Sequence, residues 1–218
     1  MSDQVAVALR RIRERIEAAG GDLGSVRILP VTKGHPVSAV RAARAAGLRE
    51  AGESYAQELL AKAEEVDDVR WHMIGRLQSN KVRQIAGFVQ LWQTIDRLSL
   101  AGEVARRSPG AQVLVQVNVT GAAQQGGCPP ERVAALTEGC TDLGLEVRGL
   151  MALGPVGSPE ASRAAFRRVR ELADGLGLPE RSMGMSGDLE AAVAEGSTLV
   201  RIGTALFGPR AGVSAVGN

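Results

Sequence analysis

Apolar residues recur along this chain with two different periods. Spacings of three or four residues, as for Val5, Leu9, Ile12 and Ile16, predict amphipathic helices, whereas short continuous or alternating apolar runs predict buried strands. The run AQVLVQVNV at 111–119 is the clearest strand, because it is rich in valine and alternates. The predicted strands are 27–33, 48–53, 70–77, 88–95, 111–119, 145–153, 182–186 and 198–207, and the predicted helices lie around 5–16, 37–46, 55–66, from 79 onward, 98–107, 129–143, 158–176 and 188–195.

The order of these segments is a strand–helix unit repeated eight times, without a linker or a break in composition. Alternating strands and helices predict parallel strands. Eight units in roughly 200 residues match the small end of the (β/α)8 barrels. The alternative is an open, doubly wound sheet, but the first strand is not followed by the glycine-rich GxGxxG turn typical of that fold. We therefore predict an α/β protein in which residues 1–218 form a single (β/α)8 TIM barrel domain, with an extra helix at the N-terminus.

Composition excludes several classes of protein. The formal net charge of +2 is too small to favour nucleic acid or an anionic membrane as the main partner. Two cysteines and two histidines, without CxxC or HxxxH spacing, predict neither a disulfide framework nor a metal site. The first 17 residues lack a continuous apolar core, so we expect no signal peptide. No apolar run reaches the length of about 18 residues that a membrane span needs. A cytoplasmic protein is expected.

The first strand ends at a lysine. The apolar run 28–31 leads into Thr32 and Lys33, and the turn Gly34-His35-Pro36 follows at once. A lysine at the carboxyl end of a buried strand has a lowered pKa, and its neutral amine can attack a carbonyl. Only three of the 26 basic residues are lysines, which suggests that an amine is needed here. The alternative is a structural lysine whose amine simply reaches solvent.

Groups suited to an anion follow the last two strands. Ser186 and Gly187 precede a helix after the seventh strand, and Arg201, Gly203 and Thr204 belong to the eighth strand and its end. Barrel enzymes often bind phosphate in these two loops, through backbone N–H groups and hydroxyls. Each motif alone is weak evidence for a phosphate site. Together with the lysine of the first strand, they predict an aldehyde-bearing phosphate compound as the ligand.

Several longer stretches resemble a known family. They are PVTK at 30–33, WHMIGRLQSNK at 71–81, VNVTGAAQQGGCPPE at 117–131, RGLMAL at 148–153 and SMGMSGDLEAAVAEGSTLVRIGTALFG at 182–208. By these stretches nearly the whole chain resembles the YggS/PROSC family of pyridoxal-phosphate homeostasis proteins. That family has fold type III and is similar to the N-terminal barrel of alanine racemase.

The resemblance implies roles for particular residues. Lys33 would carry pyridoxal 5′-phosphate as an internal aldimine, Ser186, Gly187, Gly203 and Thr204 would surround the phosphate, and Arg201 would lie near the pyridine ring. One position departs from the family pattern, because Gly-Glu-Asn-Tyr is replaced by Gly52-Glu53-Ser54-Tyr55. Ser54 is expected at the ring side of the cofactor, but it is shorter than asparagine and lacks its amide donor.

The sequence also favours a carrier over a catalyst. Racemisation needs acid–base groups on both faces of the cofactor, and the sequence printed here continues for only some ten residues after the last strand, so we expect no second domain to supply them. An arginine beside the ring nitrogen would disfavour its protonation. We expect a monomer that stores pyridoxal 5′-phosphate or transfers it to pyridoxal-phosphate-dependent apo-enzymes. The alternatives are a racemase-like enzyme with weak or narrow activity and a Schiff-base aldolase that binds a sugar phosphate transiently.

Structural roles explain four other residues that have reactive side chains. His72 lies within a strand, where a hydrogen-bonded core histidine is expected. His35 follows the lysine closely enough to titrate near the site, although the turn alone explains its presence. Lys81 caps a helix or makes a secondary ligand contact. Cys128 has no recognisable base beside it and is expected to be structural.

Overall fold

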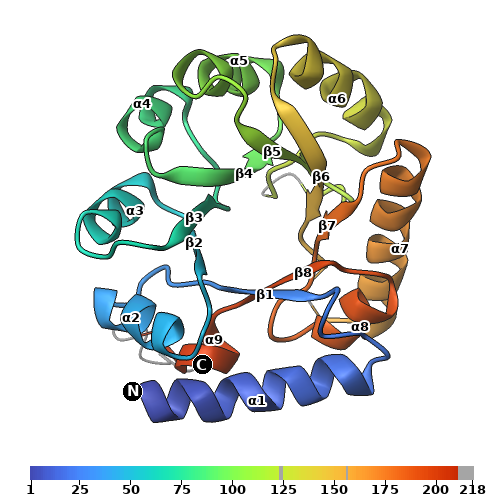
Figure 1. Ribbon diagram of the computed structural model, residues 1–218. Coiled ribbons are helices and arrows are strands. Elements are labelled where there is room, and N and C mark those ends of the chain that lie inside the picture. Colours follow the sequence, from blue (N-terminus) through green and yellow to red (C-terminus); the bar gives the residue numbers. More distant parts are fainter. Residues whose placement is uncertain (123–124, 156, 211–218) are drawn as a thin grey trace, which may run out of the picture.

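Eight strands, all paired in parallel, form the centre of the computed structural model, which describes residues 1–122, 125–155 and 157–210. The strands are β1 (Arg27–Pro30), β2 (Glu50–Glu53), β3 (Arg70–Met73), β4 (Val89–Ile95), β5 (Gln112–Val117), β6 (Glu146–Ala152), β7 (Glu180–Ser182) and β8 (Leu199–Ile202). Their order in the sheet is β1-β8-β7-β6-β5-β4-β3-β2. A parallel bridge between Val31 and Gly52 joins the two ends of this sheet, and the Thr32 N–H donates to the Gly52 carbonyl at 3.1 Å. The prediction of a TIM barrel is confirmed (Figure 1).

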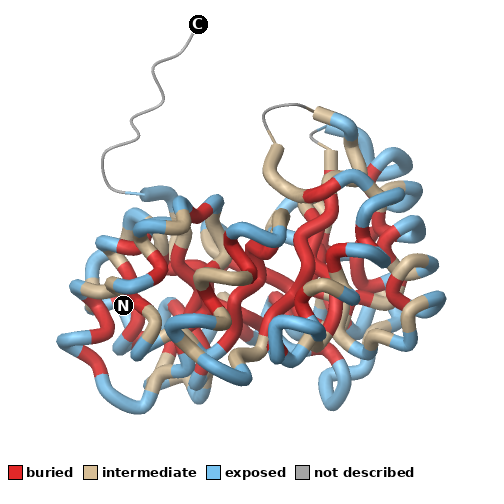
Figure 2. Tube along the Cα trace, turned by 90° about the horizontal axis from the view of Figure 1, so that it is seen from above, coloured by how far each residue is buried: buried red, intermediate tan, exposed pale blue. Residues whose placement is uncertain are grey.

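Helices surround the barrel and cover the outer faces of the strands (Figure 1). The helices that follow successive strands are α2 (Val37–Ala45), α3 (Ala56–Ala63), α4 (Val82–Ile85), α5 (Leu98–Arg107), α6 (Val133–Asp142), α7 (Pro159–Gly175), α8 (Leu189–Ala194) and α9 (Thr204–Phe207). Short 3₁₀ turns, η1 (Ser79–Lys81) and η2 (Pro130–Arg132), lead into α4 and α6. The buried positions follow the strands through the middle of the molecule, while the outer helix faces and loops are exposed (Figure 2).

The extra N-terminal helix is α1 (Ser2–Ala18). Its predicted apolar stripe, Val5, Leu9, Ile12 and Ile16, is fully buried. The stripe packs against α2, α8 and α9, so α1 closes the outside of the barrel beside β1 and β8 (Figure 1). Burying a large aliphatic side chain stabilises a fold by about 1.5–3 kcal/mol, which explains why α1 is held in place.

Several predicted strand boundaries are wrong. β1 ends at Pro30, β3 ends at Met73 and β7 spans Glu180–Ser182, whereas at β8 the type of element itself changes. The segment 198–207 was expected to be a single strand, but β8 ends at Ile202 and Thr204–Phe207 forms α9. Gly203 lies between them with φ −108° and ψ −82°, a conformation that does not continue a strand. The break turns the chain at the carboxyl end of β8, at the mouth of the barrel.

The described residues contain no helix long and apolar enough to cross a membrane. Within the same ranges, no group of three or more His, Cys, Asp or Glu residues is arranged to hold a metal ion. Cys128 and Cys140 are buried free thiols, and burial raises the pKa of each to about 11. Cys128 is therefore a structural residue rather than a nucleophile.

Candidate functional site

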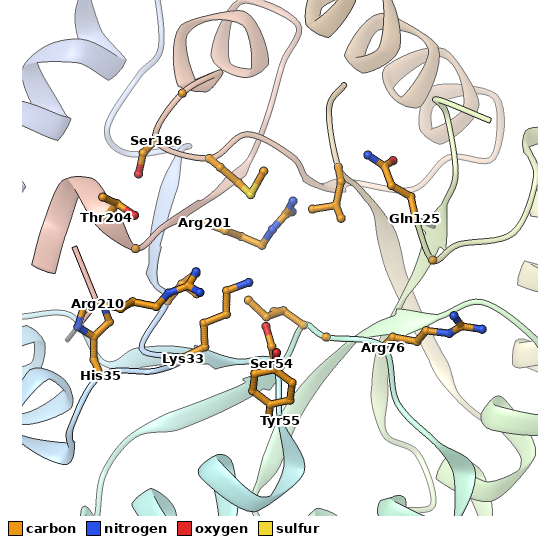
Figure 3. Close-up of a pocket in the computed structure, with 18 of the residues that line it drawn as sticks. Lys33, His35, Ser54, Tyr55, Arg76, Gln125, Ser186, Arg201, Thr204 and Arg210 are labelled. Atoms are coloured by element: carbon orange, nitrogen blue, oxygen red, sulfur yellow. The ribbon is translucent and has the colours of Figure 1, made fainter. Parts of the chain in front are cut away.

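A cavity of about 530 Å³ opens at the carboxyl ends of the strands. This volume lies within the roughly 300–1,000 Å³ typical of small-molecule sites. All of the residues expected from the sequence to bind the cofactor line it: Lys33, Ser54, Ser186, Gly187, Arg201, Gly203 and Thr204. Figure 3 shows the Lys33 amine in the middle of the cavity, with Ser186 and Thr204 on one side and Arg76 and Gln125 on the other.

Lys33 is half-buried at the mouth of the barrel, just beyond the end of β1. Desolvation lowers the pKa of its amine, and the positive charges of Arg210 and Arg201 lower it further. A lowered pKa increases the fraction of neutral amine, which is the nucleophilic form. The structure therefore gives Lys33 the environment that carbonyl chemistry requires.

The backbone around Lys33 is held by a buried charged network. Thr32 Oγ1 donates to Glu53 Oε1 at 2.7 Å, and Lys62 Nζ donates to the same oxygen at 2.6 Å and to the Thr32 carbonyl at 2.7 Å. Lys62 also pairs with Glu58 at 3.1 Å, and Glu58 accepts the N–H of Gly34 at 2.7 Å. Both neighbours of Lys33 in the chain are thus fixed to α3. Sequence reasoning did not find this network.

Four residues form one end of the cavity, which we call the hydroxyl cup: Ser186, Gly187, Gly203 and Thr204. Ser186 Oγ accepts the N–H of Ala205 at 3.2 Å, which connects the loop after β7 to the start of α9. Among the described residues, the backbone N–H groups of Gly187, Gly203 and Thr204 donate to no protein acceptor. A Cβ on Gly203 would lie 3.3 Å from the Val31 carbonyl oxygen, so the chain passes close to β1 here. Free N–H groups beside two hydroxyls fit an anionic group such as a phosphate.

Arg201 lies on β8 and is almost completely buried. Its Nη1 donates to the carbonyl and the hydroxyl of Ser182 at 2.7 and 2.8 Å, and its Nη2 donates to the Ala152 carbonyl at 2.8 Å. Burial lowers the pKa of the guanidinium to about 10, so it remains charged at neutral pH. Its Nε donates no hydrogen bond within the described part of the chain, which leaves that N–H for a ligand in the cavity.

Neutral side chains in the barrel interior form a chain of hydrogen bonds that begins at Ser182, an acceptor of Arg201. Ser182 Oγ donates to Gln93 Oε1 at 2.6 Å, and Gln93 Nε2 lies 2.8 Å from His72 Nδ1. Burial, followed by the charges of Arg27 and Arg70, lowers the pKa of His72 to about 3, so its ring is neutral. Nδ1 then accepts from the Gln93 amide. His72 is a hydrogen-bonded core histidine, as expected, and Arg201 is positioned by neutral groups.

Two positions near the Lys33 side of the cavity come from the loops after β2 and β1. Ser54, the departure from the family pattern, lines the cavity beside the exposed Tyr55. His35 also lines it and packs against Phe207, with ring centroids 5.3 Å apart. Desolvation and the charge of Arg210 lower the pKa of His35, so it is neutral at pH 7.

The cavity also contains residues that sequence reasoning missed, including Arg76, Gln116, Gln125, Met185 and Arg210. Arg210 is the last described residue. A Cβ on Gly34 would lie 2.9 Å from Cδ of Arg210, so the segment after α9 lies beside the turn that follows Lys33. No local motif marks Arg210, because it follows the final helix. The segment 211–218 and part of the 117–131 stretch lie outside the described residues.

Comparison with known proteins gives matches along almost the whole chain. A sequence model of the family described as alanine racemase, N-terminal domain, matches residues 7–211. The pyridoxal phosphate homeostasis protein of Pseudomonas aeruginosa is 48% identical over 220 residues, which is 96% of each chain. The protein of the same name from Aquifex aeolicus is 40% identical and covers 95% of this chain and 97% of its own.

Solved structures are similar as well. PipY of Synechococcus elongatus, in its form with PLP bound, superimposes with a TM-score of 0.82 at 33% identity, covering 94% of this chain and 100% of PipY. An alanine racemase of Clostridium difficile superimposes with a TM-score of 0.72 at 13% identity, over 91% of this chain and 56% of the racemase. At that low identity the racemase is evidence for the fold alone.

Proposed function

Because this chain belongs to the alanine racemase N-terminal domain family and, within it, to the pyridoxal phosphate homeostasis proteins, we propose that it binds pyridoxal 5′-phosphate through Lys33. In this proposal the protein stores the cofactor or transfers it to pyridoxal-phosphate-dependent apo-enzymes, and it does not turn over amino acids to a substantial extent.

The observation that carries the proposal is the placement of three kinds of group around one cavity. The lysine amine with a lowered pKa, the hydroxyl cup and the guanidinium of Arg201 all line the same cavity (Figure 3). An aldehyde, a phosphate and a ring nitrogen are the three features of pyridoxal 5′-phosphate that these groups recognise. The fit rests on donors that have no acceptor among the residues the structure describes, namely the N–H groups of Gly187, Gly203 and Thr204 and Nε of Arg201.

Each group has a distinct task in binding. The hydroxyls of Ser186 and Thr204 and the N–H groups of the cup would donate to the phosphate, and the amine of Lys33 would hold the aldehyde carbon covalently. Arg201 Nε would donate to the ring nitrogen. When bound, the cofactor supplies a ring that withdraws electrons, and most strongly when its nitrogen is protonated. The permanent charge of Arg201 opposes that protonation by repulsion.

The ionisable groups around the cavity also argue against turnover. They are Lys33, His35, Tyr55 and three arginines, and within the described residues no carboxylate lines the cavity. Tyr55 is 61% exposed, so it is not fixed against a ligand by surrounding side chains. Proton transfer on two faces of a substrate needs two positioned acid–base groups. Lys33 is positioned, and an equally fixed partner is lacking among the described residues.

We further propose that residues 1–218 act as one domain, as a monomer and in the cytoplasm. The barrel has its sheet closed by the β1–β2 bridge, which removes the exposed strand edges that favour association. The two free thiols suit a reducing compartment. Light scattering with size-exclusion chromatography tests the monomer, since a dimer would elute with twice the mass.

The experiment is the visible spectrum of the purified protein loaded with pyridoxal 5′-phosphate, before and after borohydride. We expect an absorbance band that bleaches on reduction, and peptide mapping should place a pyridoxyl group on Lys33. The variant Lys33→Ala should lose the band and keep the circular dichroism of the fold, because Lys33 lies at the barrel mouth. A colourless protein, or a label found on Lys62 or Lys81 alone, would refute the proposal, and a colourless protein that binds sugar phosphates would favour the aldolase.

A further inference from the structure

A second cavity, of about 600 Å³, adjoins the first at the loops that follow β2, β3 and β4. The two cavities share three lining residues, Ser54, Tyr55 and Arg76. The loops after β2 and β3 are closely packed where the two cavities meet, because a Cβ on Gly75 would lie only 2.2 Å from the Ser54 carbonyl oxygen. The backbones of the two loops therefore touch, and this contact holds the backbone next to Arg76, which lines both cavities.

The charges around the second cavity are unbalanced. Arg97 pairs with Asp96 at 2.5 Å and also donates to the Leu77 carbonyl at 3.0 Å, so this cation and this carboxylate compensate each other. Arg76 and Lys81 also line the cavity, and neither forms an ion pair with any residue that the structure describes. Two cations thus have no ionic partner in the described ranges of the chain. Such a surface attracts and holds anions.

Neutral groups complete the lining. Gln57 and Gln78 contribute amide groups, and Tyr55 places an exposed aromatic ring at the rim shared with the first cavity. Arg76 lies on the side of the first cavity opposite the hydroxyl cup (Figure 3). The cationic end of the second cavity is therefore separate from the phosphate position proposed above. Two uncompensated cations match the double negative charge of a phosphate monoester better than the single charge of a carboxylate.

We propose that the second cavity binds the phosphate monoester of a small aromatic molecule while the Lys33 cavity is filled. Arg76 and Lys81 contact the phosphate, and the ring of Tyr55 flanks the aromatic part. In this proposal the ligand is a second pyridoxal 5′-phosphate, held next to the covalent site before it enters or after it is released. This identity of the ligand rests on the proposed function. The anion site itself rests on the geometry and charge of the cavity.

The test uses protein whose first cavity has been filled with pyridoxal 5′-phosphate and fixed by borohydride. Pyridoxine 5′-phosphate, which has no aldehyde, is then titrated by calorimetry. We expect one further equivalent to bind and the affinity to fall with added salt. Arg76→Gln and Lys81→Gln should each weaken binding by about tenfold, the loss of one charge-assisted contact. Arg83→Gln, an exposed arginine on α4 outside the cavity, is the matched control and should bind as wild type.

Three ligands identify the recognised group: inorganic phosphate should compete, whereas pyridoxine without phosphate and benzoate should not. The proposal is overturned if the reduced protein binds no second equivalent, if benzoate competes as well as phosphate, or if all three variants bind like wild type. If borohydride leaves no label on Lys33, the proposed function is refuted, whereas the proposal for the second cavity is not. The unlabelled protein then still tests the second cavity, because Arg76→Gln and Lys81→Gln must lower the number of pyridoxine 5′-phosphate molecules bound at a fixed concentration.

Discussion

Lys62 is the residue whose replacement should disturb the barrel mouth most. Its Nζ is held by the Thr32 carbonyl at 2.7 Å, Glu53 at 2.6 Å and Glu58 at 3.1 Å, and the Glu53 side chain is fully buried. Lys62→Met keeps the length of the side chain and removes the cation. Breaking a buried pair by removing one partner costs about 3–5 kcal/mol. Because domains have about 5–15 kcal/mol of stability in total, we expect a folded but clearly weakened protein.

The loss should depend on pH. Burial raises the pKa of Glu53, and its hydrogen bonds from Lys62 and Thr32 oppose that rise. Without Lys62 the pKa rises further, so the folded variant binds a proton that the unfolded chain, with its usual pKa of 4.5, has released. The free energy of unfolding then falls with increasing pH by up to about 1.4 kcal/mol per unit. The defect is therefore smallest near the unfolded pKa and grows until the pH passes the raised folded pKa.

Urea unfolding at several pH values from mildly acidic to mildly basic, followed by the fluorescence of Trp71 and Trp92, measures this effect. Lys81→Met is the control for removing a lysine, and it should leave the free energy of unfolding almost unchanged. Lys62→Met with Glu53→Gln should show a flatter pH dependence than Lys62→Met alone, because no carboxylate remains to titrate. A loss below about 1 kcal/mol, the value of an exposed pair, or a loss that is equal at every pH, would refute this account of the network.

Three further outcomes follow from the site. Ser186→Ala and Thr204→Val should each weaken equilibrium binding of pyridoxal 5′-phosphate by about 1–3 kcal/mol, and equally tight binding of pyridoxal without phosphate would contradict this. Gln93→Leu should shift the absorbance maximum of the bound cofactor because Ser182 Oγ loses its acceptor and the hydroxyl contact to Arg201 is disturbed, whereas an unchanged spectrum would show that the backbone carbonyls of Ser182 and Ala152 fix Arg201 without Gln93. Exchange of the α-proton of amino acids in deuterated buffer, followed by NMR, should be slow or absent, and fast exchange that disappears in Lys33→Ala would instead support the racemase-like enzyme.

Local patterns in the sequence were enough to predict the barrel and several of the residues that line the cavity at its mouth. Each strand and helix is encoded by its own periodicity, and eight such units in series leave few folds to consider. Lys33 and the hydroxyl cup were predictable for the same reason. The carboxyl ends of parallel strands meet at one edge, so residues that end β1, β7 and β8 must approach one another.

Boundaries were less well predicted where one residue decides between two structures. The apolar segment 198–207 reads as one strand, yet the backbone at Gly203 turns and starts α9. At this turn Gly203 passes close to Val31, and such proximity across 172 positions of the chain is not represented by periodicity.

The tertiary structure alone decided which polar side chains support the site. Ser182 and Gln93 are 89 positions apart, Arg201 and Ala152 are 49 apart, and Lys62 and Thr32 are 30 apart. A hydrogen bond between distant residues leaves no periodic signal, because it depends on where the fold brings two side chains together. The same holds for Arg210 beside Lys33 and for Arg76 and Lys81, which form no ion pair within residues 1–122, 125–155 and 157–210. The sequence determined which groups are available for chemistry, and packing determined which of them are neutral, charged or free to bind a ligand.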